Sequence, residues 1–113
     1  MIWSYDYIFQ IGFAIVAQQR ECDGSETGYG YGEKISTAGG CANKCQDSSS
    51  MFAFGTNAFG NTRCEDGACK CLCETSATSE GTCNQVSHSG YNLYRYTKGT
   101  IFSFTFITIW KRP

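Results

Sequence analysis

Cysteine is the residue type that offers the most chemistry in this sequence. Eight of the 113 residues are cysteines, and all of them lie between Cys22 and Cys83. Cysteines at this density form disulfides in an oxidising compartment, whereas in the reducing cytosol they more often bind metals or carry out redox reactions. An even number in so short a chain favours disulfides. We therefore expect eight paired cysteines in a protein that is secreted and extracellular.

A metal site is the competing interpretation for one part of the cysteine cluster. Cys69, Cys71 and Cys73 form a CxCxC pattern, which resembles that of thiolate-rich metal proteins. Structural zinc sites more often separate their paired ligands by two residues, and oxidation removes the thiolates that bind metal. We expect no metal and no other cofactor.

His88 is the only histidine, so a Ser-His-Asp or Cys-His site would require it. It lies in residues 87–90 (SHSG), whose composition is typical of a loop and carries no nucleophile signature. We expect a solvated loop histidine in a protein that is not an enzyme.

Two tyrosines are the ligand-binding candidates that the sequence offers. Tyr29 and Tyr31 alternate with glycines in residues 27–32 (TGYGYG), a segment that lacks the Lys-Ser/Thr ending of a phosphate-binding loop. On a flexible backbone, their rings could contact a sugar or a protein surface. The alternative is that the two rings pack locally within a mobile loop.

A hairpin is expected in the second half of the cysteine-rich region. Asp66-Gly67 is a preferred sequence for a two-residue hairpin turn. Pairing the chain about this turn places Cys64 directly opposite Cys69, close enough for a disulfide.

A short helix is expected before this hairpin, with Ser36 as its N-cap and residues 37–46 as its body. Cys41 and Cys45 are then one helical turn apart, about 6 Å, and Cys71 and Cys73 are separated by about 6.6 Å on their strand. The matched spacings allow two adjacent disulfides, which we call rungs, to join the helix to the strand. Nested pairing, in which the two inner cysteines join each other and the two outer ones join each other, favours Cys41–Cys73 with Cys45–Cys71. Spacing alone leaves open the crossed arrangement, in which the first cysteines of each pair join and the second ones join. The two remaining cysteines would tie the start of the domain to its end, so the expected disulfides are Cys22–Cys83, Cys41–Cys73, Cys45–Cys71 and Cys64–Cys69.

An apolar run near the N-terminus, residues 7–17, has the length of a signal-peptide core and is too short to span a bilayer as a helix. Ala17 is small enough to precede a cleavage site, and two glutamines follow it. No Lys or Arg precedes the run, and Asp6 is acidic. We predict a signal peptide at residues 1–17. The alternative is a buried helix or strand of the domain itself.

A second apolar run, residues 101–110 (IFSFTFITIW), begins with the alternating pattern of a strand. It is too short for a stable membrane span, and its Lys111-Arg112 ending does not suit a GPI tail. Residues 97–113 are therefore an apolar C-terminal tail or an extra strand. An exposed strand edge would permit self-association. A reading frame that runs past the true end of the domain is the third interpretation.

The pattern of residues 22–96 resembles the PAN/apple family of extracellular modules. The resemblance is carried by the opening cysteine, the helix motif Cys41-Ala-Asn-Lys-Cys45, the strand of residues 51–55 (MFAFG), the cysteine strand and the closing residues 91–96 (YNLYRY). It implies an α+β fold in which one short helix is stapled to a curved antiparallel sheet. This chain has Ser49 and Ser50 where the family usually has a cysteine.

The resemblance implies binding to an extracellular protein or carbohydrate and supplies no catalytic residue. We therefore expect a recognition or adhesion module. A toxin-like or antimicrobial peptide is the alternative, but such peptides usually carry a marked positive charge, and the net charge here is −1. The same near-neutral charge argues against nucleic acid as a partner.

Overall fold

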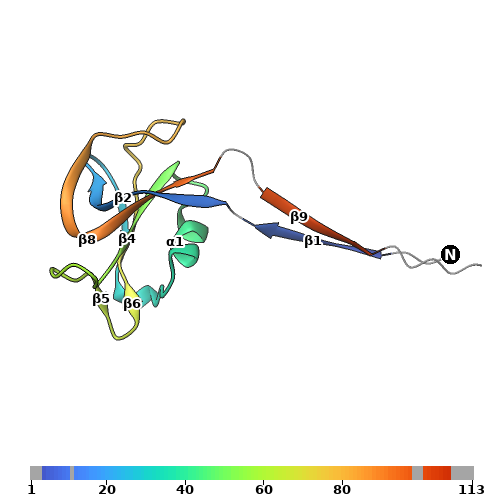
Figure 1. The fold of residues 1–113 in the computed structure, drawn as a ribbon, viewed down its shortest axis with the longest axis horizontal. Helices are drawn as coiled ribbons and strands as arrows, with labels where there is room; N and C mark the ends of the chain where they lie inside the picture. The colour runs from blue at the N-terminus through green and yellow to red at the C-terminus, as the bar shows by residue number, and fades with distance from the viewer. Residues whose placement is uncertain (1–3, 11, 98–100, 108–113) are drawn as a thin grey trace, which may run out of the picture.

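The computed structural model describes residues 4–10, 12–97 and 101–107, with side chains only in the range 12–97. In chain order the elements are β1 (Ser4–Gln10), β2 (Phe13–Cys22), β3 (Thr27–Tyr29), the 3-10 helix η1 (Tyr31–Glu33), α1 (Ala38–Cys45), β4 (Met51–Gly55), β5 (Cys64–Glu65), β6 (Ala68–Cys69), β7 (Cys71–Cys73), β8 (Gln85–Tyr96) and β9 (Ile101–Ile107). Five strands form an antiparallel sheet in the order β2-β8-β4-β7-β3. The helix lies against this curved sheet (Figure 1). The expected α+β fold, one short helix on a curved antiparallel sheet, is confirmed.

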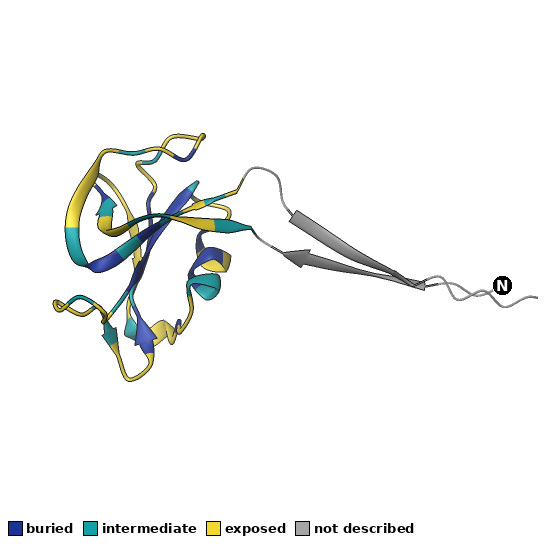
Figure 2. Ribbon diagram, in the orientation of Figure 1, coloured by how far each residue is buried: buried dark blue, intermediate teal, exposed yellow. Residues whose placement is uncertain are grey.

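The central strands are buried on both faces, as the dark blue ribbon of β4 shows (Figure 2). Successive side chains of a strand point to opposite faces. Phe52 and Phe54 of β4 accordingly join the cluster on the helix side, whereas Met51 and Ala53 join the cluster on the other side with Leu93 of β8. The sheet therefore lies between two small hydrophobic clusters, one on each of its faces.

The helix starts one residue later than expected. Its N-cap is Thr37, whose side-chain oxygen accepts a hydrogen bond from the Gly40 N–H at 3.0 Å. Ser36 is a similar residue, but it lies outside this cap. Thr37 is the residue with the extended backbone that an N-cap adopts before the first helical turn.

The predicted hairpin is present. Cys64 lies opposite Cys69, and the two are joined by a disulfide with a Cα–Cα distance of 4.0 Å. Asp66 and Gly67 have φ values of 52° and 80°, the left-handed backbone that a two-residue turn of this type requires.

The two rungs between helix and strand are present, but their pairing is exchanged. The disulfides are Cys41–Cys71 and Cys45–Cys73, not the expected Cys41–Cys73 and Cys45–Cys71. Nesting presumes that the helix and strand run in opposite directions. Here they run in the same direction, so the first cysteine of α1 meets the first cysteine of β7. The crossed arrangement that spacing had left open is the one found.

The sheet extends further toward the N-terminus than the predicted boundary at Cys22. Cys22 ends β2 and is bonded to Cys83, as expected from the sequence. However, β2 begins at Phe13, which pairs with Tyr96 and therefore lies within the predicted signal peptide of residues 1–17. The Phe13 ring centroid lies 5.6 Å from that of Phe52, against the helix-side core. Residues 13–17 thus form a strand of the domain, which is the alternative that the sequence had left open for this apolar run.

Part of the C-terminal apolar run is also a strand. β9 pairs with β1 in an antiparallel register that runs from Ser4 opposite Ile107 to Gln10 opposite Ile101. This ladder lies beyond the start of β2 and the end of β8 (Figure 1). Of the predicted tail, residues 98–100 and 108–113 lie outside the described residues. Self-association through this strand remains a prediction. In the described part of the chain, no helix is long and apolar enough to cross a membrane.

Candidate functional site

The principal candidate site is a polar hollow of about 550 Å³ between β2, the first half of β8 and the loop before β5. We call it the polar hollow. Its lining consists of Gln18, Gln19, Arg20, Asn61, Ser87, His88 and Ser89. Every one of these side chains can form hydrogen bonds, and none is aliphatic or acidic.

The hollow exists because the ladder between β2 and β8 is interrupted. Gln18 lies opposite Asn92, but Arg20 lies opposite Ser87, so residues 88–91 have no partner on β2. Between them Gln19 has a φ of 56°, and its N–H donates to the Asn92 side-chain oxygen at 3.2 Å. Such irregularities re-aim side chains. This explains why three consecutive residues of β2 line one hollow, whereas a regular strand would turn the middle one away.

One wall of the hollow is formed by Asn61, and the loop of residues 61–63 that carries it is held against β8 at a glycine. A Cβ atom on Gly90 would lie 2.5 Å from the Asn61 carbonyl oxygen and 2.7 Å from Cγ of Arg63. The Gly90 carbonyl also accepts a hydrogen bond from the Thr56 N–H at 2.8 Å. Only a residue without a side chain permits this approach. Asn61 itself has a φ of 28°, a strained value that its neighbours must maintain.

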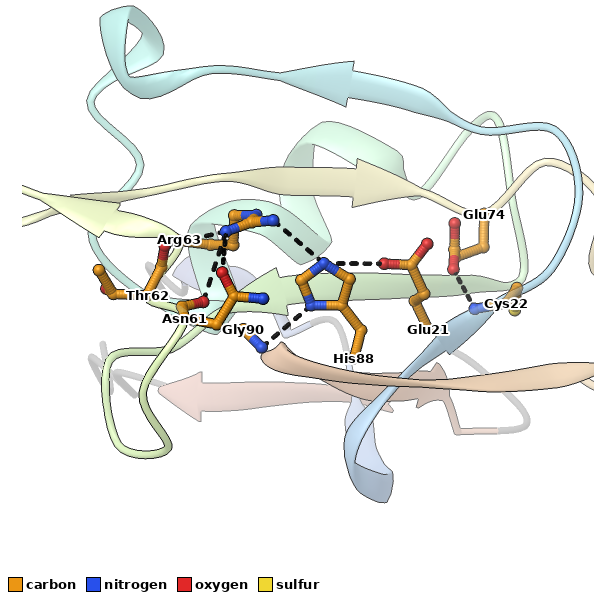
Figure 3. A network of polar contacts seen from close by, with 8 residues as sticks. All are labelled: Glu21, Cys22, Asn61, Thr62, Arg63, Glu74, His88 and Gly90. Carbon is orange, nitrogen blue, oxygen red and sulfur yellow. Dashed lines mark hydrogen bonds and ion pairs between the residues drawn. The ribbon is translucent and has the colours of Figure 1, made fainter.

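Arg63 links the loop of residues 61–63 to His88 on β8, as Figure 3 shows. Its Nη1 donates to the side-chain oxygen of Asn61 at 3.0 Å, and its Nη2 lies 3.2 Å from Nε2 of His88. The other ring nitrogen of His88, Nδ1, accepts a hydrogen bond from the Gly90 N–H at 3.0 Å. The Glu21 carboxylate lies 4.0 Å from Nε2. The histidine is therefore half-buried on β8 and fixed on several sides, not solvated on a loop as the sequence predicted.

A buried carboxyl group lies at the end of β2, next to Cys22 (Figure 3). Glu74 is fully buried, and its Oε2 accepts a hydrogen bond from the Cys22 N–H at 2.5 Å, while its Oε1 has no hydrogen-bond partner among the described residues. Burial and, after it, the neighbouring Glu26 carboxyl together raise the pKa of Glu74 to about 8. Burial, and then Glu26, also raises the pKa of Glu21.

The two tyrosine candidates lie in different environments. Tyr31 lines a second hollow of about 520 Å³, which we call the tyrosine hollow, together with Lys34 and the hairpin turn of residues 65–68. The Lys70 ammonium lies 5.5 Å from the centre of its ring. Tyr29 instead packs against the helix-side core, with the Lys44 ammonium over its ring. The structure thus supports a surface role for Tyr31 and a packing role for Tyr29.

The cysteine cluster offers no thiolate among the described residues. The sulfurs of Cys41, Cys45 and Cys71 lie within 4.8 Å of one another, which is a spacing that a metal could bridge. Each of these sulfurs is in a disulfide. Their proximity therefore reflects two adjacent rungs.

The polar hollow could not be found from the sequence. Its residues come from three separate segments. Residues 18–20 follow the predicted signal peptide directly, and residues 87–89 were predicted to be a solvent-exposed loop. Gly90, within a strand of otherwise larger residues, was the one available sign of a close backbone approach.

Comparison of the chain with protein-family models, with curated proteins and with solved structures gave no match.

Proposed function

We propose that this chain is a secreted extracellular recognition module, related in plan to the PAN/apple domains that its sequence resembles, and that it binds carbohydrate in the polar hollow. The lining of the hollow is the observation that carries the proposal. Five neutral amide or hydroxyl side chains surround one guanidinium and one imidazole. A sugar presents hydroxyl groups on all sides, and groups that both donate and accept hydrogen bonds complement them.

Rigidity supports the same function. Four disulfides tie the helix, the hairpin and the ends of the sheet together, and Gly90 and Arg63 hold the wall of the hollow in place. A preorganised site loses less conformational entropy on binding than a flexible one. The disulfides also support export, because such bonds form and persist outside the reducing cytosol.

A glycan array tests the proposal. The oxidised wild-type protein should bind a defined subset of glycans, and Asn61→Ala should lose that binding because Asn61 lines the polar hollow. Tyr31→Ala is the matched control, since Tyr31 lines the tyrosine hollow. Binding that depends on Tyr31 and not on Asn61 would move the site to the tyrosine hollow. Absence of glycan binding by the folded protein would refute the carbohydrate proposal.

A further inference from the structure

The permanently charged side chain on the described lining of the polar hollow is a cation, Arg20. Arg20 is exposed on its lining, and its guanidinium has no hydrogen-bond or ion-pair partner among the residues whose side chains are described. Among the residues whose side chains are described, no carboxylate lines the hollow. By contrast, the tyrosine hollow contains Lys34 together with Glu65 and Asp66, so its charges are mixed.

A second guanidinium reinforces this asymmetry. Arg63 does not line the hollow, but it touches two residues that do, Asn61 and His88. The acid nearest to this group is Glu21, whose carboxylate lies 4.0 Å from the imidazole of His88. Two guanidiniums therefore lie at the hollow, that of Arg20 on its lining and that of Arg63 in contact with the lining, while the Glu21 carboxylate lies beside His88. Positive potential in a concave surface attracts an anionic group and orients it.

The neutral part of the lining indicates what the anionic group is attached to. The three amides and two serine hydroxyls provide hydrogen bonds in several directions, and none of the described lining residues is an aliphatic side chain that could receive an apolar anchor. Although β2 is an edge strand of the sheet, a peptide that adds to such an edge gains its specificity from pockets for its side chains, and no apolar pocket of that kind is found among the described residues of the lining. A ligand that combines many hydroxyls with one planar anion fits this lining better. Arg20 can hold a carboxylate through two parallel hydrogen bonds.

We propose that the polar hollow binds an acidic saccharide and that Arg20 pairs with the carboxylate of its sugar. This inference rests on the proposed carbohydrate function and specifies its ligand class. Arg20 is the residue that contacts the anion. Arg63 is a positioning residue, which acts through Asn61 and His88.

The test uses a hexasaccharide of alternating glucuronic acid and N-acetylglucosamine, and the same hexasaccharide with its carboxyl groups converted to methyl esters. Each is titrated into the full, oxidised chain by calorimetry or NMR. We expect the acid form to bind at least tenfold more tightly than the ester. Arg20→Gln should weaken binding of the acid at least tenfold without affecting the ester, because it removes the guanidinium and keeps hydrogen-bonding capacity. Arg20→Lys should recover only part of the loss, since it restores charge without the planar geometry.

Lys70→Gln is the matched control, because Lys70 is a cation beside the tyrosine hollow. It should change the affinity less than twofold. Equal losses in Arg20→Gln and Lys70→Gln would show diffuse attraction and overturn the inference. Equal affinity for the acid and the ester would also overturn it, and would leave the carbohydrate function intact if Asn61→Ala abolished both. A polyglutamate peptide that bound as tightly, through Arg20, would overturn the saccharide class. Failure of both oligosaccharides and of the glycan array would refute the proposed function as well.

Discussion

The Glu74 carboxyl accepts a hydrogen bond from the backbone N–H of Cys22, across 52 residues of sequence. This contact fixes the end of β2 beside the disulfide that Cys22 forms with Cys83. A fully buried carboxylate normally needs a cation or several donors. No ion pair involves Glu74 among the described residues, and one of its oxygens is unpartnered. Its protonation state is therefore coupled to folding.

We predict that the free energy of unfolding falls as the pH rises from 5 to 8.5. The folded pKa of Glu74, about 8, lies above the ordinary value of 4.5, so the folded state holds this proton more tightly. The stabilisation is complete below pH 4.5 and is lost as the pH rises through 8. The loss should be about 2–4 kcal/mol. Urea unfolding of the oxidised protein across this range measures it.

Glu74→Gln should remove most of this pH dependence, because an amide stays neutral and its carbonyl can still accept from the Cys22 N–H. The variant should be more stable than the wild type at pH 8.5. Glu80→Gln is the control, since Glu80 is exposed and its replacement should preserve the wild-type slope. A slope that survives in Glu74→Gln would show that another group controls it.

The number of residues that each disulfide encloses predicts how much it contributes to stability. Replacing Cys41 and Cys71 together with alanine removes a bond between residues 30 positions apart, whereas replacing Cys64 and Cys69 removes one that spans 5. Because longer closed loops restrict the unfolded chain more, the first pair should cost about 1.6 kcal/mol more than the second. Denaturant unfolding of the two double variants makes this comparison. Equal costs would mean that loop length does not determine the contribution of these bonds.

Gly90→Ala should displace the wall of the polar hollow. Its Cβ would lie 2.5 Å from the Asn61 carbonyl oxygen, and a backbone atom cannot move aside without shifting the loop. We expect a loss of about 1–3 kcal/mol in stability, which is typical of overpacking. The NMR signals of His88 and Asn61 should shift as well. Gly32→Ala, with no atom within 4 Å of the added Cβ, should alter stability by less than about 0.5 kcal/mol. Unchanged signals at His88 in Gly90→Ala would contradict the positioning role of this glycine.

Local features of the fold were predictable because they depend on a few neighbouring residues. Asp66-Gly67 specifies its own turn, and the alternation in residues 51–55 specifies a strand. The order of the rungs was not predictable. Spacing along α1 and β7 is the same in either direction, and the direction of α1 is determined by how the chain reaches it from the distant strands.

The polar hollow depends on such distant relationships even more strongly. It forms where the pairing of β8 with β2 is interrupted, between the pairs Gln18–Asn92 and Arg20–Ser87. This interruption of the ladder has no local sequence signal. The apolar N-terminal run was ambiguous for a different reason. A signal-peptide core and a partly buried strand are both short and apolar, and only pairing with Tyr96 distinguishes them.

The structure favours retention of Phe13 in the folded protein. Its ring lies edge-on to Phe52 and Tyr94, with centroid distances of 5.6 and 5.8 Å, whereas Ile15 on the same strand is 49% exposed. We therefore expect Phe13→Ala to cost about 2–4 kcal/mol and Ile15→Ala less than about 1 kcal/mol in unfolding free energy.

The same packing bears on processing of the N-terminus. Cleavage after Ala17 would remove Phe13 and the pairs that residues 13–17 form with β8, and would expose the rings of Phe52 and Tyr94. We expect intact mass analysis of secreted protein to find Phe13 present, with any cleavage before it. Material that begins at Gln18 and is as stable as the longer chain would show instead that residues 13–17 are a leader and that the sheet does not need them.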